Sequence, residues 1–150
     1  MCGNILLRSN YIVIKEHSLV VERHEGICTL DEIIAFSKSQ VADPDYSAGH
    51  TSIVDIRDLK IDASYFDVKA FADFCQQYTS GVVARRTAFI TKTPEQVANI
   101  ILFNRMQADP PQFLTVVSTI GAAVSWVGCD LVADVVAEAL QNLKMKTSTI

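Results

Sequence analysis

Ile53-Val54-Asp55-Ile56 is a brief, mostly apolar run rich in β-branched residues, and such a run is typical of a strand buried on both faces of a sheet. A helix is expected next, from about Ser64 to Tyr78, because apolar side chains recur there at helical spacing. Thr87–Thr91 predicts the following strand. A strand, a helix and a second strand in that order indicate parallel pairing through a right-handed crossover.

The strongest helix signal lies directly after that second strand. Thr93-Pro94-Glu95-Gln96 combines a capping Thr, Pro at the first helical position and Gln three residues after the cap. The helix that it opens is apolar nearly all round and stops at Pro110-Pro111, so we expect it to be buried on several sides or to lie at an interface. Thr29-Leu30-Asp31-Glu32 predicts another capping box, in which the Thr hydroxyl binds an early N–H and Glu32 reaches back.

The N-terminal part predicts an antiparallel hairpin. Tyr11–Glu16 and Leu19–Glu25 are two β-rich runs separated by a short turn. We expect Gly26 to end the second strand. Glu22 and His24 alternate onto one face of that strand, and we interpret them as ordinary surface groups.

The C-terminal part predicts one more strand and two helices. Phe113–Val117 forms the strand, a short helix covers Ile120–Val127, and a final helix begins near Asp130 with an apolar stripe. The expected fold is therefore α/β, with a mostly parallel sheet of about five strands that carries helices and begins with the hairpin.

The composition fits one folded domain over residues 1–150. Apolar residues make up 49% of the 150 residues and charged residues 20%, and domains most often run ~100–150 residues. Apolar runs stay short of the ~18 residues of a membrane span, and the N-terminus lacks the pattern of a secretory signal. We therefore expect a soluble, cytoplasmic protein without a membrane span.

Charge and cysteine usage argue against two further classes. The net charge is −4 and the pI is near 5.3, whereas a nucleic-acid binder needs a basic face. The four cysteines form no Cys-x-x-Cys pair and are expected to be buried or idle thiols. The histidines are not paired at ligand spacing, so we expect neither a metal site nor another cofactor.

Several of these features resemble one family. The hairpin ending at Glu25-Gly26, the run from Thr29 to Glu32 and the strand with Asp-x-Arg-Asp at residues 55–58 resemble the small bacterial SpoIIAA-like proteins. These form a divergent branch related to the STAS domain and are loosely grouped with Sec14-type lipid carriers. A last strand followed by a short helix containing Trp126 is similar to the way the family ends. The resemblance covers residues 10–128 and leaves 129–150 as an additional C-terminal helix.

The resemblance implies a sheet with helices on its faces and, in anti-anti-sigma members, a phosphorylatable Ser in an Asp-Ser-Ser-Gly turn. The nearest match here is Asp62-Ala63-Ser64-Tyr65, with a loop one residue shorter and Tyr in place of Gly. Ser64 is therefore a candidate phosphosite. The favoured interpretation is that its hydroxyl caps the following helix, so the sigma-factor role is not carried over.

A second candidate site is the charged triplet Asp55, Arg57 and Asp58, placed at the carboxyl end of a central strand, where open α/β sheets usually bind ligands. These residues could form a polar floor for a small ligand or a partner loop. The favoured alternative is an Arg–Asp pair that ties the loop down. Phe103 and Met106, on the apolar helix, are the other candidate binding residues.

These observations rank three functions. The first is a non-enzymatic, STAS-like regulatory module that binds another protein, or itself as a homodimer, through the helices at 94–107 and 130–144. The second is a carrier of a small hydrophobic or anionic ligand. An enzyme ranks third, and no catalytic residue is predicted. A cavity lined by Phe103 and Met106, with Arg57 at its mouth, would favour the carrier, and a flat apolar patch would favour the module.

Overall fold

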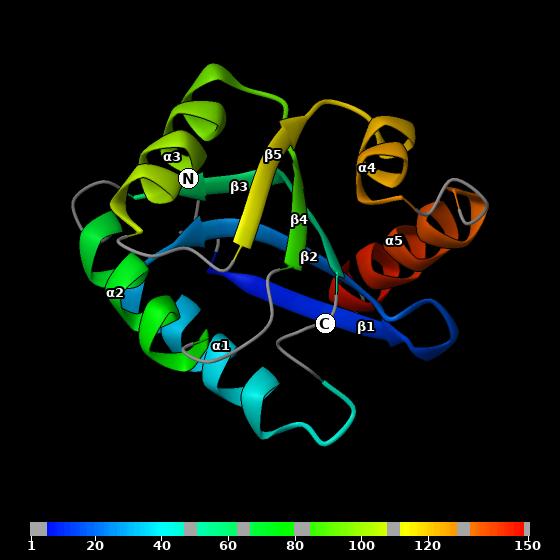
Figure 1. Ribbon diagram of the computed structural model, residues 1–150, viewed down its shortest axis with the longest axis horizontal. Helices are drawn as coiled ribbons and strands as arrows, with labels where there is room; N and C mark the ends of the chain where they lie inside the picture. Colours follow the sequence, from blue (N-terminus) through cyan, green and yellow to red (C-terminus); the bar gives the residue numbers. More distant parts are fainter. Residues whose placement is uncertain are drawn as a thin grey trace.

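The strands form one mixed sheet. The structure is a computed structural model that describes residues 6–46, 51–62, 67–79, 85–107, 112–128 and 133–148. Within these ranges the sheet has five strands, in the order in which they occur in the chain (Figure 1). The first pair is antiparallel and all later pairs are parallel. The strands are β1 (Arg8–Ile14), β2 (Leu19–Cys28), β3 (Thr51–Ile61), β4 (Arg85–Ile90) and β5 (Gln112–Val117).

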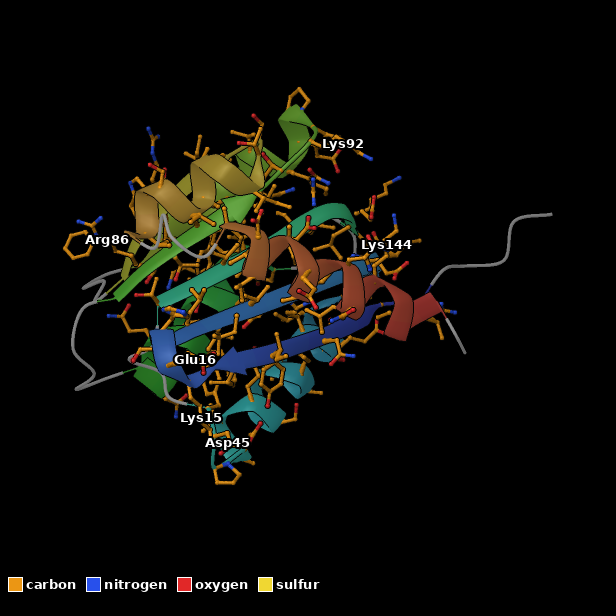
Figure 2. The ribbon with its side chains drawn as sticks, turned by 90° about the vertical axis from the view of Figure 1, so that its right-hand side faces the viewer. Lys15, Glu16, Asp45, Arg86, Lys92 and Lys144 are labelled. Atoms are coloured by element: carbon orange, nitrogen blue, oxygen red, sulfur yellow. The ribbon has the colours of Figure 1, made fainter. Side chains whose placement is uncertain are left out.

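The helices lie on both faces of this sheet, as Figure 1 shows. Each of α1 (Leu30–Ala42), α2 (Val68–Thr79) and α3 (Pro94–Met106) connects two neighbouring parallel strands. Because right-handed crossovers between sequential strands all return on the same side, these three helices share one face. The other face is covered by α4 (Ile120–Val127) and α5 (Ala133–Ser148), which lie in front of the sheet in Figure 2.

Alternation along the strands gives each face its own hydrophobic layer. Ile53 and Ala88 pack with α4 and α5, whereas Val54 and Phe89 belong to the layer under α1, α2 and α3. The α5 stripe is buried in the first layer through Val136, Ala139, Leu140 and Leu143. The helices of the described ranges include none long and apolar enough to cross a membrane.

Two expectations about helix starts have different outcomes. The capping box of α3 is confirmed, since Thr93 Oγ1 accepts from the Gln96 backbone N–H at 3.2 Å and Gln96 Oε1 accepts from the Thr93 N–H at 3.1 Å. The box at α1 is wrong. The helix does begin after Thr29, but the Thr29 hydroxyl donates to the Glu32 carboxylate at 2.8 Å and caps no backbone N–H.

The hairpin is confirmed, but its second strand is longer than expected. A 3-10 turn at Lys15–His17 joins β1 to β2, and Ser18 closes it with φ 49°. Gly26 does not end β2. It lies within the strand at φ 91°, next to a register shift between Arg23 and Glu25, and β2 continues to Cys28. A bulge interrupts the ladder without ending it, and β3 provides the backbone partners for the additional residues.

Two contacts hold the end of α1 against the hairpin. The Tyr11 hydroxyl donates to the Asp43 carboxylate, and Lys15 pairs with Asp45 at 2.8 Å (Figure 2). Burial, together with Asp43, raises the pKa of Tyr11 above its ordinary value, so the phenol remains a donor at neutral pH. As a result, the C-terminal turns of α1 are fixed over β1 and β2.

Candidate functional site: a cavity under the crossover helices

A cavity of about 170 Å³ lies between the sheet and the three crossover helices. Its floor comes from β2, β3 and β4, and its walls from α1, α2 and α3. The lining is mostly apolar, as is usual for small-molecule sites. The aromatic residues that line it are Phe36, Tyr46, Phe71, Phe74, Phe89 and Phe103.

The lining combines large rings on the helices with short side chains on the sheet. Phe71 of α2 stacks with Phe74, with ring centroids 6.4 Å apart, and contacts Phe103 of α3 at 5.4 Å. The floor includes the short side chains of Ser52 and Thr87. The rings thus pack on one another, and the short floor side chains leave space above the sheet.

One end of the cavity carries a hydrogen-bonded network on β2. His24 Nε2 lies 3.1 Å from the Glu22 carboxylate, and His24 Nδ1 lies 2.6 Å from Ser9 Oγ of β1. The Gln40 side chain of α1 donates to the other Glu22 oxygen. Since the carboxylate requires a proton on Nε2, a neutral His24 accepts from Ser9 at Nδ1. Each carboxylate oxygen of Glu22 therefore accepts a hydrogen bond.

The expectation that Glu22 and His24 are surface groups is wrong. His24 is only 4% exposed, and the Glu22 side chain is 12% exposed. The two residues do share a face, as alternation predicts, but β2 is an interior strand and α1 covers that face, where the Phe36 ring meets the His24 ring edge-on at 5.1 Å.

Ser9, His24 and Glu22 have the residue types of a hydrolase triad, but their placement favours a structural role. In triads the Ser is exposed to substrate and the base takes its proton. Here Ser9 is opposite His24 in the β1–β2 ladder and is outside the set of described residues that line the cavity. The chain of hydrogen bonds thus orients the Glu22 carboxylate at the cavity wall.

Ser52 and Thr87 are buried hydroxyls in the cavity floor. They are 2% and 3% exposed, and neither Ser52 Oγ nor Thr87 Oγ1 has a hydrogen-bond partner among the described residues. They are register partners on neighbouring strands β3 and β4. Unsatisfied buried polar groups are uncommon in native proteins, so this pair requires an explanation.

The predicted charged triplet lies elsewhere. The expectation that the triplet lies at the carboxyl end of a strand is wrong, because β3 pairs with β2 as far as Ile61. Only the pairing of β3 with β4 ends at Asp55. Arg57 binds Asp55 through two hydrogen bonds of 2.9 and 2.8 Å. This is the geometry of an Arg–Asp pair that ties the chain down. Neither residue lines the cavity.

The remaining predicted site residues are separated from one another. Phe103 is part of the cavity wall. Met106, the last residue of α3, is not one of the described residues that line the cavity. Asp58 pairs with Arg23 at 2.7 Å and with Lys92 at 3.6 Å. Burial alone would raise the pKa of Asp58, but these two cations outweigh it and hold the pKa below its ordinary value. Ser64 lies outside the described residues.

The titratable groups of the wall do not form a metal centre. Within the described ranges, His, Cys, Asp and Glu form no group of three or more that could hold a metal ion. Burial, together with nearby Glu32, raises the pKa of the Cys28 thiol in the cavity lining to about 12. Cys28 is therefore a neutral thiol at physiological pH and behaves as a small apolar surface.

Comparisons with known proteins support the fold. The structure is similar to the crystal structure of an uncharacterized DUF3478-family protein from Shewanella loihica PV-4, described as having a SpoIIAA-like fold, with a TM-score of 0.56 and 12% identity over 85% of this chain and 98% of that chain. The sequence matches no family model. No curated protein matches it significantly. At this identity the likeness shows the fold alone, and the fold of this chain is SpoIIAA-like α/β.

Proposed function

We propose that the protein binds a small, largely apolar molecule in the cavity under α1, α2 and α3, without transforming it chemically. The observation that carries the proposal is the cavity of about 170 Å³ inside a hydrophobic layer. Small-molecule sites are usually concave, mostly apolar and lined by a few polar groups. The residues that line this cavity have that character, with Glu22, Gln40, Ser52 and Thr87 among apolar and aromatic side chains. A binding role accounts for this combination.

The volume limits the size of the ligand. A cavity of ~150 Å³ lined by aliphatic and aromatic side chains accepts benzene, and drug-sized ligands require ~300–1,000 Å³. The cavity, at about 170 Å³, thus fits a single ring or a short branched chain. A long acyl chain would require the helices to move apart.

Binding is tested with small apolar probes and a variant that fills the cavity. Toluene and indole are titrated into the protein while its melting temperature and NMR spectrum are followed. A probe at a hundred times its Kd stabilises the folded state by about 2.7 kcal/mol, so the melting temperature should rise. Val54→Phe places a ring in the floor and should abolish the shift.

The matched control is Val135→Phe. It makes the same substitution at an exposed position of α5, on the other side of the sheet, and it should leave the shift unchanged. If neither probe stabilises the wild-type protein, or if Val54→Phe responds as strongly as the wild type, the proposal is wrong.

A second function, a protein-interaction module, is supported by exposed apolar side chains. Ile101 and Leu102 on α3 are 46% and 41% exposed, and Phe113 on the edge strand β5, which points to the α4/α5 face, is 61% exposed. Exposed apolar side chains favour contact with a partner protein or a second copy. Phe113→Lys should abolish any concentration-dependent dimer in sedimentation equilibrium, and a wild-type protein that is monomeric at millimolar concentration would exclude the homodimer.

A further inference from the structure

Two buried hydroxyls without a hydrogen-bond partner among the described residues lie on neighbouring strands in the cavity floor. Ser52 and Thr87 are register partners, so their backbones lie about 4.8 Å apart across the parallel pair. Each hydroxyl can donate one hydrogen bond and accept two. Because both are more than nine-tenths buried and neither bonds to the other or to another described residue, a group placed between them could satisfy both.

On β3 and β4, the polar part of the cavity floor is confined to one end. Ser52 and Thr87 lie near the amino ends of these strands, and Glu22 of β2 is the register partner of Val54, two residues further along. Gln40, from the last turn of α1, bonds to Glu22. Beyond Ser52 and Thr87, the residues of β3 and β4 that line the cavity are apolar: Val54, Ile56, Leu59, Ile61 and Phe89. The cavity therefore matches a molecule with one polar end and one apolar end.

The charges of the wall select against an ionic ligand. Of the described residues that line the cavity, none is a lysine or an arginine. An anion would lose its hydration without a lysine or arginine to compensate, and it would be repelled by the Glu22 carboxylate. Both effects are large in an apolar space. Glu22 already accepts from His24 and Gln40, so it does not require a cation from the ligand.

We infer that the ligand is a neutral amphipathic molecule about the size of one ring, with a hydroxyl or carbonyl group held between the Ser52 and Thr87 side chains. This inference rests on the proposed function and specifies its ligand class. The apolar part of the ligand lies against the aromatic rings of α2 and α3, and the polar group points to the amino ends of β3 and β4.

The experiment uses four probes of similar size: toluene, phenol, benzoate and benzylamine. Their Kd values are measured by titration calorimetry for the wild type, for Ser52→Ala, for Thr87→Val and for the double variant. The main readout is the ratio of phenol affinity to toluene affinity, because these probes have nearly the same shape and only phenol carries a hydroxyl. Thr115→Val is the control. Thr115 pairs with Ala88 of the opposite hydrophobic layer, so this variant should not change the ratio.

We expect the ratio to fall about two- to twelvefold for each hydrogen bond that is removed, which corresponds to the net contribution of a neutral hydrogen bond. Toluene affinity should not fall, since toluene forms no hydrogen bond with either hydroxyl and the substitutions only remove polar atoms from the floor. In the wild type, benzoate and benzylamine should bind more weakly than phenol.

Each contrary result has its own meaning. If toluene binds but the ratio is the same in all variants, the hydroxyls do not hold the ligand and the inference fails while the proposed function stands. If benzoate or benzylamine binds most tightly, the ligand is not neutral. If none of the four probes binds the wild type, the proposed function fails together with the inference.

Discussion

The Gln96 side chain joins the start of α3 to β3, and its replacement should be among the most destabilising changes in the protein. Gln96 is 7% exposed. Its amide nitrogen donates to the carbonyl oxygens of Ile56 and Leu59 at 2.8 and 2.9 Å. Its amide oxygen accepts from the backbone N–H groups of Lys92 and Thr93 at 2.7 and 3.1 Å. One side chain thus satisfies backbone groups from both elements.

The magnitude follows from these four hydrogen bonds. Each contributes about 0.5–1.5 kcal/mol net, and a buried group that loses its partner costs about 1–3 kcal/mol. Solvent can reach part of the exposed backbone after truncation, so we expect Gln96→Ala to lower the free energy of unfolding by about 2–5 kcal/mol. Gln96→Glu should be similarly destabilising at pH 7, because it keeps the volume but directs a carboxylate at the Ile56 and Leu59 carbonyl oxygens.

Urea denaturation followed by circular dichroism measures both variants, and Glu95→Gln is the matched control. Glu95 is the exposed neighbour in the first turn of α3, and loss of its charge there costs about 0.3–1 kcal/mol. Because α3 carries Ile100 and Phe103 of the cavity wall, Gln96→Ala should also weaken toluene binding. If Gln96→Ala is no more destabilising than Glu95→Gln, the side chain does not join the two elements and the reasoning is refuted.

Three further predictions concern single side chains. Thr93→Ala should cost about 1 kcal/mol and Thr93→Ser should not; equal urea midpoints for the two variants would contradict the cap. Cys28, with its pKa raised to about 12, should resist iodoacetamide at pH 8 in the native protein but react in urea, as read by peptide mass spectrometry; rapid native labelling would show that it is accessible. Asp58 has a pKa below its ordinary 3.8, so its ion pairs contribute stability that is complete above about pH 5 and is lost as pH falls through the lowered pKa. Asp58→Asn should therefore flatten the decline in melting temperature between pH 5 and pH 3. An unchanged decline would show that other carboxylates cause it.

The sequence predicts helix starts better than strand ends because the former depend on neighbouring residues. The Thr93–Gln96 capping box requires residues three positions apart, and α3 begins where that pattern places it. The ends of β2 and β3 depend instead on each other. The pairing of Glu25 with Asp58 and of Cys28 with Ile61 extends both strands past the residues that predicted their ends, and no local pattern contains that information.

The cavity was not expected because a rule for one topology was applied to another. Ligands bind at the carboxyl ends of strands where the strand order reverses and helices leave on opposite faces. In the described sheet the order does not reverse, so α1, α2 and α3 share one face and the space lies beneath them. Phe103 lies in the cavity lining, whereas Asp55 and Arg57 bind each other.

Polar side chains on the covered face of interior strands are the sequence feature that points to the candidate site. Glu22 and His24 lie on the face of β2 that lines the cavity, and Ser52 and Thr87 directly precede the apolar runs of β3 and β4. When helices cover both faces of a sheet, each such side chain loses its hydration and requires a partner. Glu22 and His24 provide partners for each other. Ser52 and Thr87 face the cavity and have none in the described part of the chain, and a polar group of a bound molecule is the partner that their position favours.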